Sequence, residues 1–217
     1  MTASAEARTQ RIVWVVLAVT LAGVAAAAGW RVLSGRSTPQ ALPVYGTVPA
    51  FALVERSGKT ISARDLTGRV WIADFIFTRC TGMCPILGSR LAALLRRLEE
   101  RGTGGVTAVS FTVDPTGDDP ATLRRYAERF GADPERWLFL TGDREAVERL
   151  VRDGFRLSIA ELPPGERETS PEPITHSDRF VLIDKSLRIR GYYHGTDDEG
   201  VANLERDVAA LASGGGG

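Results

Sequence analysis

Val70–Pro85 reads VWIADFIFTRCTGMCP, and this stretch decides the fold. Its first half, Val70–Phe77, is mostly apolar and rich in β-branched and aromatic side chains, which predicts a strand buried on both faces. Cys80 follows that strand, and Cys84 directly precedes Pro85, a residue type favoured in the first turn of a helix. Leucines at helical spacing then predict a helix over Pro85–Arg101. The two cysteines therefore mark the junction between a buried strand and a helix.

Beyond this junction, strand and helix signals alternate. Strands are predicted at Val106–Val113, Trp137–Leu140, Phe155–Leu162, Phe180–Ile183 and Arg188–Tyr193. Helices are predicted at Pro120–Phe130, Arg144–Asp153 and Glu199–Leu211, the first with Asp119 as its N-cap. This order indicates an α/β protein with a mixed central sheet flanked by helices on both faces. A strand–cysteine–helix junction in such an order is the thioredoxin-like arrangement.

An apolar segment precedes this domain. Ile12–Trp30 carries no charge, and a helix of that length spans roughly 28 Å, close to the hydrocarbon core of a bilayer. We therefore expect a tail at residues 1–11, a single transmembrane anchor at 12–30 and a linker at 31–44. A cleaved signal peptide is the alternative, because Ala25–Ala28 offers small residues for cleavage. The thioredoxin-like domain is expected at 45–212 and a flexible glycine-rich tail at 213–217.

Composition excludes several classes of protein. The 217 residues include 27 basic and 27 acidic ones, and 43% are hydrophobic, which is ordinary for a globular protein. Four arginines and one glutamate precede Ser37, so 23 basic and 26 acidic residues follow. A slightly acidic domain argues against binding to nucleic acid. Two cysteines can form one disulfide, one redox pair or part of one metal site.

The cysteine spacing leaves these chemistries open. Three residues separate Cys80 from Cys84, one more than in a thioredoxin-type motif. Such a loop can close a disulfide, and it can also place two soft thiolates around Cu(I), Zn(II) or an iron–sulfur cluster. A pair of purely structural thiols is the third interpretation.

Histidine and aspartate side chains supply further candidates. His176 ends a proline-rich segment, Leu162–Thr175, that we expect to be a long surface loop. His194 follows a predicted strand, and the residues alone do not choose between the two histidines. Asp114 and Asp118 follow the second core strand and can act electrostatically on a nearby site.

Taken together, these motifs resemble the Sco/SenC family of membrane-anchored copper proteins. The resemblance runs through PVYGTVPAF at Pro43–Phe51, the Val70–Pro85 stretch, FTVDPTGDDPATLRRYAERFGA at Phe111–Ala132, WLFLTG at Trp137–Gly142 and THSDRFVLID at Thr175–Asp184. It implies a thioredoxin-like fold and a copper ion bound by Cys80, Cys84 and His176. It also implies that Asp118 supports metal binding or redox behaviour. Thr81 departs from the family pattern, since many members carry proline there, but it removes no ligand.

The resemblance further implies a function and a location. We expect a copper metallochaperone, rather than an enzyme, that assists assembly of the binuclear copper centre of cytochrome c oxidase. Its partners would be the copper-accepting subunit of the oxidase and another periplasmic copper chaperone as donor. The protein would be a single-pass protein of the bacterial cytoplasmic membrane, with its domain on the extracytoplasmic side. The alternative is a thiol–disulfide oxidoreductase that reduces the copper-site cysteines of the oxidase through Cys80 and Cys84.

Overall fold

The computed structural model describes residues 14–26, 30, 41–162, 165 and 174–214, and only the backbone of Glu161, Thr175 and His176. Residues 14–26 are helical. Within the described ranges, no helix has both the length and the apolar character needed to cross a membrane. Residues 12, 13 and 27–29 of the predicted anchor lie outside the described residues, as do most of the predicted linker and the last residues of the tail.

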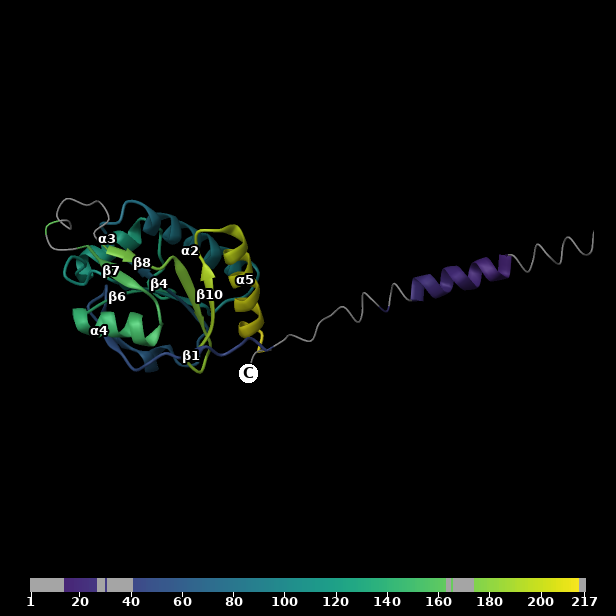
Figure 1. Cartoon of the computed structure of the whole chain (residues 1–217), viewed down its shortest axis with the longest axis horizontal. Coiled ribbons are helices and arrows are strands. Elements are labelled where there is room, and N and C mark those ends of the chain that lie inside the picture. Colours follow the sequence, from purple (N-terminus) through teal and green to yellow (C-terminus); the bar gives the residue numbers. More distant parts are fainter. Residues whose placement is uncertain (1–13, 27–29, 31–40, 163–164, 166–173, 215–217) are drawn as a thin grey trace, which may run out of the picture. The chain divides into compact units, whose positions relative to one another are not determined.

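The described residues from Ala41 onward are built around an eight-stranded mixed sheet (Figure 1). Along the sheet the strands are β1 (Gly46–Thr47), β10 (Arg188–His194), β9 (Arg179–Ile183), β4 (Trp71–Ile76), β5 (Thr107–Thr112), β6 (Trp137–Thr141), β2 (Ala52–Glu55) and β3 (Thr60–Ser62). The three central strands β4, β5 and β6 run parallel, and the outer strands pair antiparallel. β7 (Ile159–Glu161) and β8 (Ile174–His176) form a separate antiparallel pair.

Helices complete the layers. They are α2 (Met83–Glu100), α3 (Pro120–Glu128), α4 (Arg144–Arg149) and α5 (Asp198–Ala212), with a short 3₁₀ helix η1 at Ala63–Leu66 and a π-helical turn η2 at Leu150–Gly154. Asp119 caps α3 as expected, because its carboxylate accepts a hydrogen bond from the Thr122 amide at 2.7 Å. α5 contacts α2, β9 and β10, so α2 and α5 lie on the same face of the sheet.

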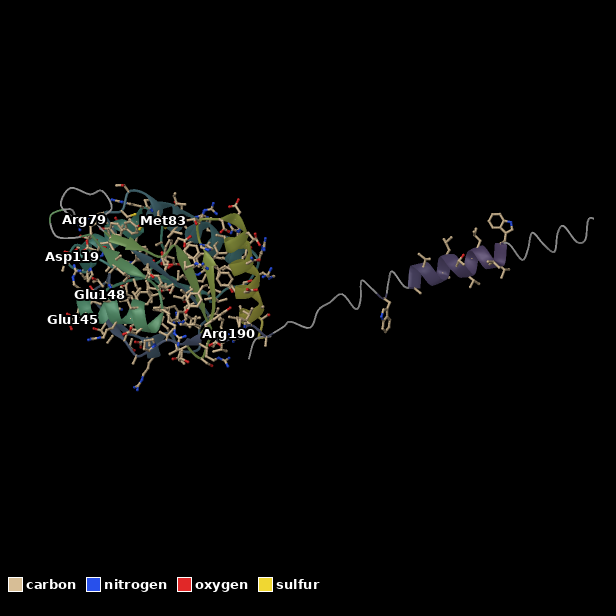
Figure 2. All side chains as sticks on the ribbon, viewed as in Figure 1. Arg79, Met83, Asp119, Glu145, Glu148 and Arg190 are labelled. Carbon is tan, nitrogen blue, oxygen red and sulfur yellow. The ribbon has the colours of Figure 1, made fainter. Side chains whose placement is uncertain are left out.

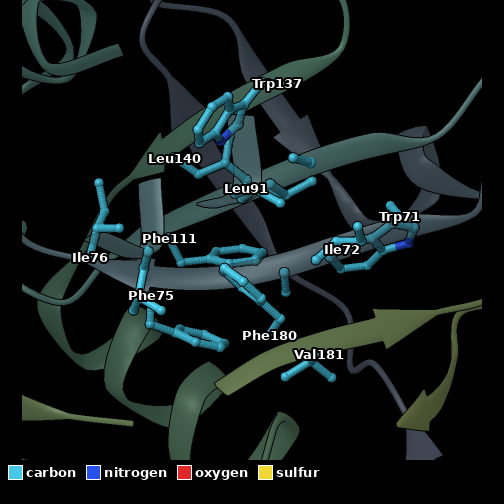
Figure 3. Packing of buried hydrophobic residues seen from close by; sticks show 14 of the residues in the cluster. Trp71, Ile72, Phe75, Ile76, Leu91, Phe111, Trp137, Leu140, Phe180 and Val181 are labelled. Atoms are coloured by element: carbon cyan, nitrogen blue, oxygen red, sulfur yellow. The ribbon is translucent and has the colours of Figure 1, made fainter. Parts of the chain in front are cut away.

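An aromatic cluster fills the opposite face. Phe75 of β4 stacks on Phe111 of β5 with ring centroids 5.8 Å apart, and Figure 3 labels both residues. Phe155 packs edge-on against Phe75. All three rings are buried. Successive side chains of a strand point to opposite faces, so Asp74, next to Phe75, points to the face that carries α2.

The core strands and helices match the sequence predictions, but some elements were not predicted and three expectations need correction. Three short strands, β1 to β3, and η1 precede β4 and were not predicted. The predicted helix Arg144–Asp153 is α4 followed by the π-helical turn η2. The predicted strand Phe155–Leu162 is shorter, because Phe155 enters the aromatic cluster and Arg156 adopts a positive φ of 54°. The predicted loop Leu162–Thr175 ends earlier, because β8 begins at Ile174.

Candidate functional site

The structure brings Cys80 and Cys84 together at the start of α2. β4 ends at Ile76, and α2 begins at Met83 with Gly82 as its N-cap, so Cys84 lies in the first helical turn. The Cys84 backbone N–H donates a hydrogen bond to Cys80 Sγ, with an N–S distance of 3.3 Å. Amide groups at a helix N-terminus favour negative charge, so this position stabilises a thiolate on Cys80.

Both cysteines are thiols and both are buried. Cys80 is 6% exposed, whereas Cys84 is completely covered. A hydrogen bond between the two sulfur groups and burial of the Cys84 side chain raise the pKa of Cys84 far above its ordinary value. The pair is therefore asymmetric, with Cys80 nearer to the surface and Cys84 held as the protonated partner. Arg79 and Met83, which directly precede Cys80 and Cys84, lie at the end of the domain remote from Arg190 (Figure 2).

Asp118 supports the backbone that leads to Cys80. Its carboxylate accepts hydrogen bonds from the Thr78 amide at 3.0 Å, from the Thr78 hydroxyl at 2.5 Å and from the Thr112 hydroxyl at 2.5 Å. Burial raises the pKa of Asp118 above its ordinary value, although these three hydrogen bonds oppose the shift. Two of these hydrogen bonds come from Thr78, two residues before Cys80, which makes Asp118 a positioning residue for the loop.

Asp114 holds the same loop through Arg79. Its carboxylate forms a 2.6 Å ion pair with Arg79, the residue before Cys80. Burial alone would raise the pKa of Asp114, but the hydrogen bonds from Arg79 and Thr116 and the charge of Arg79 lower it overall. The connection after β5 therefore holds the cysteine loop through two separate carboxylates.

The two histidines occupy different places. His176 ends β8, where its backbone pairs with Ile159, and its side chain lies outside the described part of the chain. His194 ends β10, and its Nδ1 lies 2.9 Å from the carboxylate of Asp178. Among the side chains that the structure describes, no three His, Cys, Asp or Glu residues are grouped so as to hold a metal ion. Joining His176 to the cysteine pair therefore stays a prediction.

Sequence reasoning missed a buried carboxylate on β4 that lies near the cysteines. Asp74 on β4 is 1% exposed and accepts a hydrogen bond from Ser110 on β5, which in turn accepts one from the Trp137 indole at 2.8 Å. Asp74 Oδ2 and the Tyr126 hydroxyl are buried and find no hydrogen-bond partner among the described residues. Burial raises the pKa of Asp74 to about 7, and its charge in turn acts on the Cys84 thiol. A lone acidic residue in the apolar run Val70–Phe77 was the available signal.

Comparison with known proteins identifies the family. The model of the family described as SCO1/SenC matches residues 40–212. The chain belongs to the SCO1/SenC family. The Sco fold of the domain is shown by similarity to a solved SCO1/SenC family lipoprotein from Bacillus anthracis, which is 30% identical. That likeness covers 78% of this chain and 97% of the lipoprotein with a TM-score of 0.71.

Two further Sco structures are similar to this chain. BsSco, a member of the Sco family of cytochrome c oxidase assembly proteins in which a disulfide switch was identified, is 28% identical over 80% of this chain and 99% of its own, with a TM-score of 0.69. Yeast Sco1 with copper bound is 25% identical over 76% of this chain and 89% of its own, with a TM-score of 0.63. Sco proteins thus include both a copper-bound state and a disulfide-forming one.

Proposed function

We propose that this protein is a copper metallochaperone that assists assembly of the binuclear copper centre of cytochrome c oxidase. The observation that carries the proposal is the pairing of two cysteines at one helix N-terminus, with Cys80 Sγ 3.3 Å from the Cys84 amide nitrogen. Membership of the SCO1/SenC family and the copper-bound state of yeast Sco1 support it. Copper is the cargo of this reaction, and the acceptor is the copper-binding subunit of the oxidase.

The donor set suits copper. Two thiolates are soft ligands that select Cu(I), and an imidazole from His176 makes Cu(II) acceptable as well. Together they form a trigonal set for Cu(I) or part of a tetragonal set for Cu(II). Because Cys84 is held protonated, copper binding must release its proton. Transfer then proceeds by exchange of these ligands for cysteines of the acceptor.

Location follows from the same proposal. The uncharged stretch Ile12–Trp30 supports a single anchor in the bacterial cytoplasmic membrane, with the domain on the extracytoplasmic side. A homologue from Bacillus anthracis is a lipoprotein, which also fits work at a membrane surface. A periplasmic copper chaperone is the proposed donor.

The second candidate function is thiol–disulfide exchange, because the two cysteine sulfurs lie close together. A thiol–disulfide oxidoreductase would use Cys80 as the attacking thiolate and Cys84 as the resolving thiol, reducing a disulfide of the oxidase copper site while Cys80 and Cys84 become a disulfide. The disulfide switch identified in BsSco favours this candidate. It needs both cysteines but not His176.

The deciding experiment titrates the reduced full chain, in detergent, with Cu(I) and separately with Cu(II). We expect one equivalent to bind, with a thiolate-to-Cu(II) absorption band. Cys80→Ser and Cys84→Ser should abolish that band, and His176→Ala should remove it or weaken Cu(II) binding at least about tenfold, since one ligand is lost. His194→Ala is the matched control and should change neither.

Two results would redirect the account. If His194→Ala removed the band and His176→Ala did not, the third ligand would be wrongly assigned. Absence of specific copper binding, with rapid disulfide exchange in the wild type and in His176→Ala, would establish the reductase instead.

A further inference from the structure

A pocket opens on the face of the sheet that carries the aromatic cluster. It has a volume of about 580 Å³ and lies between the β7–β8 pair, β10 and the segment that leads into β1. Small-molecule sites in proteins typically measure about 300–1,000 Å³, so the pocket has the size of a ligand site. The cysteine pair is not among its lining residues.

One wall of the pocket is aromatic. Tyr45 and Tyr192 meet edge to face with ring centroids 5.5 Å apart. The Tyr192 hydroxyl donates to the Phe155 carbonyl at 3.1 Å, which fixes the ring. Leu157 and Ala160 extend the apolar part of the lining. This wall suits a flat apolar or aromatic group.

The remaining lining is cationic and hydroxylic. Arg156, Arg179, Ser158 and Ser177 contribute it, and none of the described lining residues is acidic. Within the described part of the chain Arg156 forms no ion pair. Arg179 donates a hydrogen bond to the Tyr192 carbonyl at 3.4 Å and reaches the carboxylate of Asp178 only at 4.0 Å. Two guanidinium groups with so little neutralisation of their charge suit a carboxylate or a phosphate.

Backbone conformation gives a second, independent observation. The Phe155 amide donates to the Leu150 carbonyl at 2.9 Å, and the Leu157 amide donates to the Val151 carbonyl at 3.0 Å, so Arg156 stands at the left-handed position that ends a helix. Its φ is 54°, where glycine is usual. Arg156 thus lines the pocket from a position where its backbone is strained.

We propose that this pocket is a binding site for a small organic anion, in which Arg156 and Arg179 hold a carboxylate or phosphate and the Tyr45–Tyr192 wall holds an apolar body. The site goes beyond copper handling, since it contains neither cysteine. Ser177 directly follows His176, so an anion bound there lies beside the segment that carries the proposed third copper ligand.

The test measures binding of benzoate and phenyl phosphate to the full chain in non-ionic detergent, with benzyl alcohol as the uncharged control of the same shape. We expect saturable binding of both anions at one site, and binding of benzyl alcohol at least about tenfold weaker. Arg156→Asn and Arg179→Gln should each weaken anion binding about tenfold, the order expected for losing one charge-assisted hydrogen bond. Arg149→Gln is the control, because Arg149 lies on α4 outside the pocket lining.

Arg156→Gly keeps the test independent of folding. Glycine accepts the positive φ, so this variant should fold at least as well as the wild type and still lose anion binding about tenfold. Equal affinity for benzoate and benzyl alcohol, no binding of either anion to the wild type, or unchanged binding in Arg156→Gly and Arg179→Gln would each overturn the proposal.

Discussion

Asp74 is the only charged residue in the run Val70–Phe77, and its burial makes stability depend on pH. Its pKa is raised from 3.8 to about 7, so the folded state binds more protons than the unfolded state between these values. Proton binding by Asp74 therefore favours the folded state fully below about pH 4, and this stabilisation is lost as pH rises to about 7. The difference amounts to roughly 4 kcal/mol.

Asp74→Asn should remove this dependence, because an amide of the same shape cannot ionise. Between pH 5 and pH 8 the wild type should lose about 2–3 kcal/mol more unfolding free energy than the variant. Urea denaturation at the two pH values checks it. Parallel pH profiles for the two proteins would show that Asp74 titrates in its ordinary range.

Asp118 supplies a second prediction at this scale. Asp118→Ala leaves the half-buried Thr78 amide and two threonine hydroxyls without their acceptor. This loss should cost roughly 2–4 kcal/mol of stability and weaken copper binding by loosening the cysteine loop. Urea denaturation and copper titration measure the two effects. Asp119→Ala is the neighbouring control and should cost only about 1 kcal/mol, through loss of the α3 cap, with copper binding unchanged. Native stability of Asp118→Ala would refute the positioning role.

Sequence patterns located the cysteines well and their supports poorly. Cys80 and Cys84 were predictable because both follow closely on a buried strand, and the second lies at the start of a helix. Thr78 was not, because its role depends on Asp118, which is 40 residues away along the chain. Pairings of that kind are set by the tertiary structure and leave no local pattern.

At the scale of elements, the left-handed end of the α4–η2 helix has a stability consequence of its own. Arg156→Gly relieves the positive φ, so its unfolding free energy should be equal to that of the wild type or higher by up to about 1 kcal/mol. Thermal or urea unfolding measures it. Arg156→Ala, which keeps the strain, should show no such gain. A clear loss of stability in Arg156→Gly would mean that the arginine side chain supports the fold.

Element prediction failed where strands are short or where a turn interrupts the pattern. β1 and β3 span two and three residues, too few for a strand period to show. β8 falls in a proline-rich segment, and it forms because it can pair with β7. The apolar runs of β4 and β5 were predictable because both faces of these strands are buried. The leucine stripe of α2 was predictable because one whole side of the helix is buried.

On the scale of the whole domain, the sheet separates two chemical faces. The α2 face carries the cysteine pair and the hydrogen-bond network of Asp74, Ser110 and Trp137. The opposite face carries the aromatic cluster and the proposed anion pocket. β4 connects them, because adjacent side chains of this strand, Asp74 and Phe75, enter different layers.

The central claim is that copper binds to two sulfurs of the Cys80–Cys84 pair and to one nitrogen of His176. X-ray absorption at the copper edge, on the full chain loaded with one equivalent of Cu(I), tests it most directly. We predict two sulfur ligands and one imidazole nitrogen in the wild type, two sulfurs without that nitrogen in His176→Ala, and an unchanged spectrum in His194→Ala. A spectrum with fewer than two sulfurs, or one that His176→Ala leaves unchanged, would contradict the account.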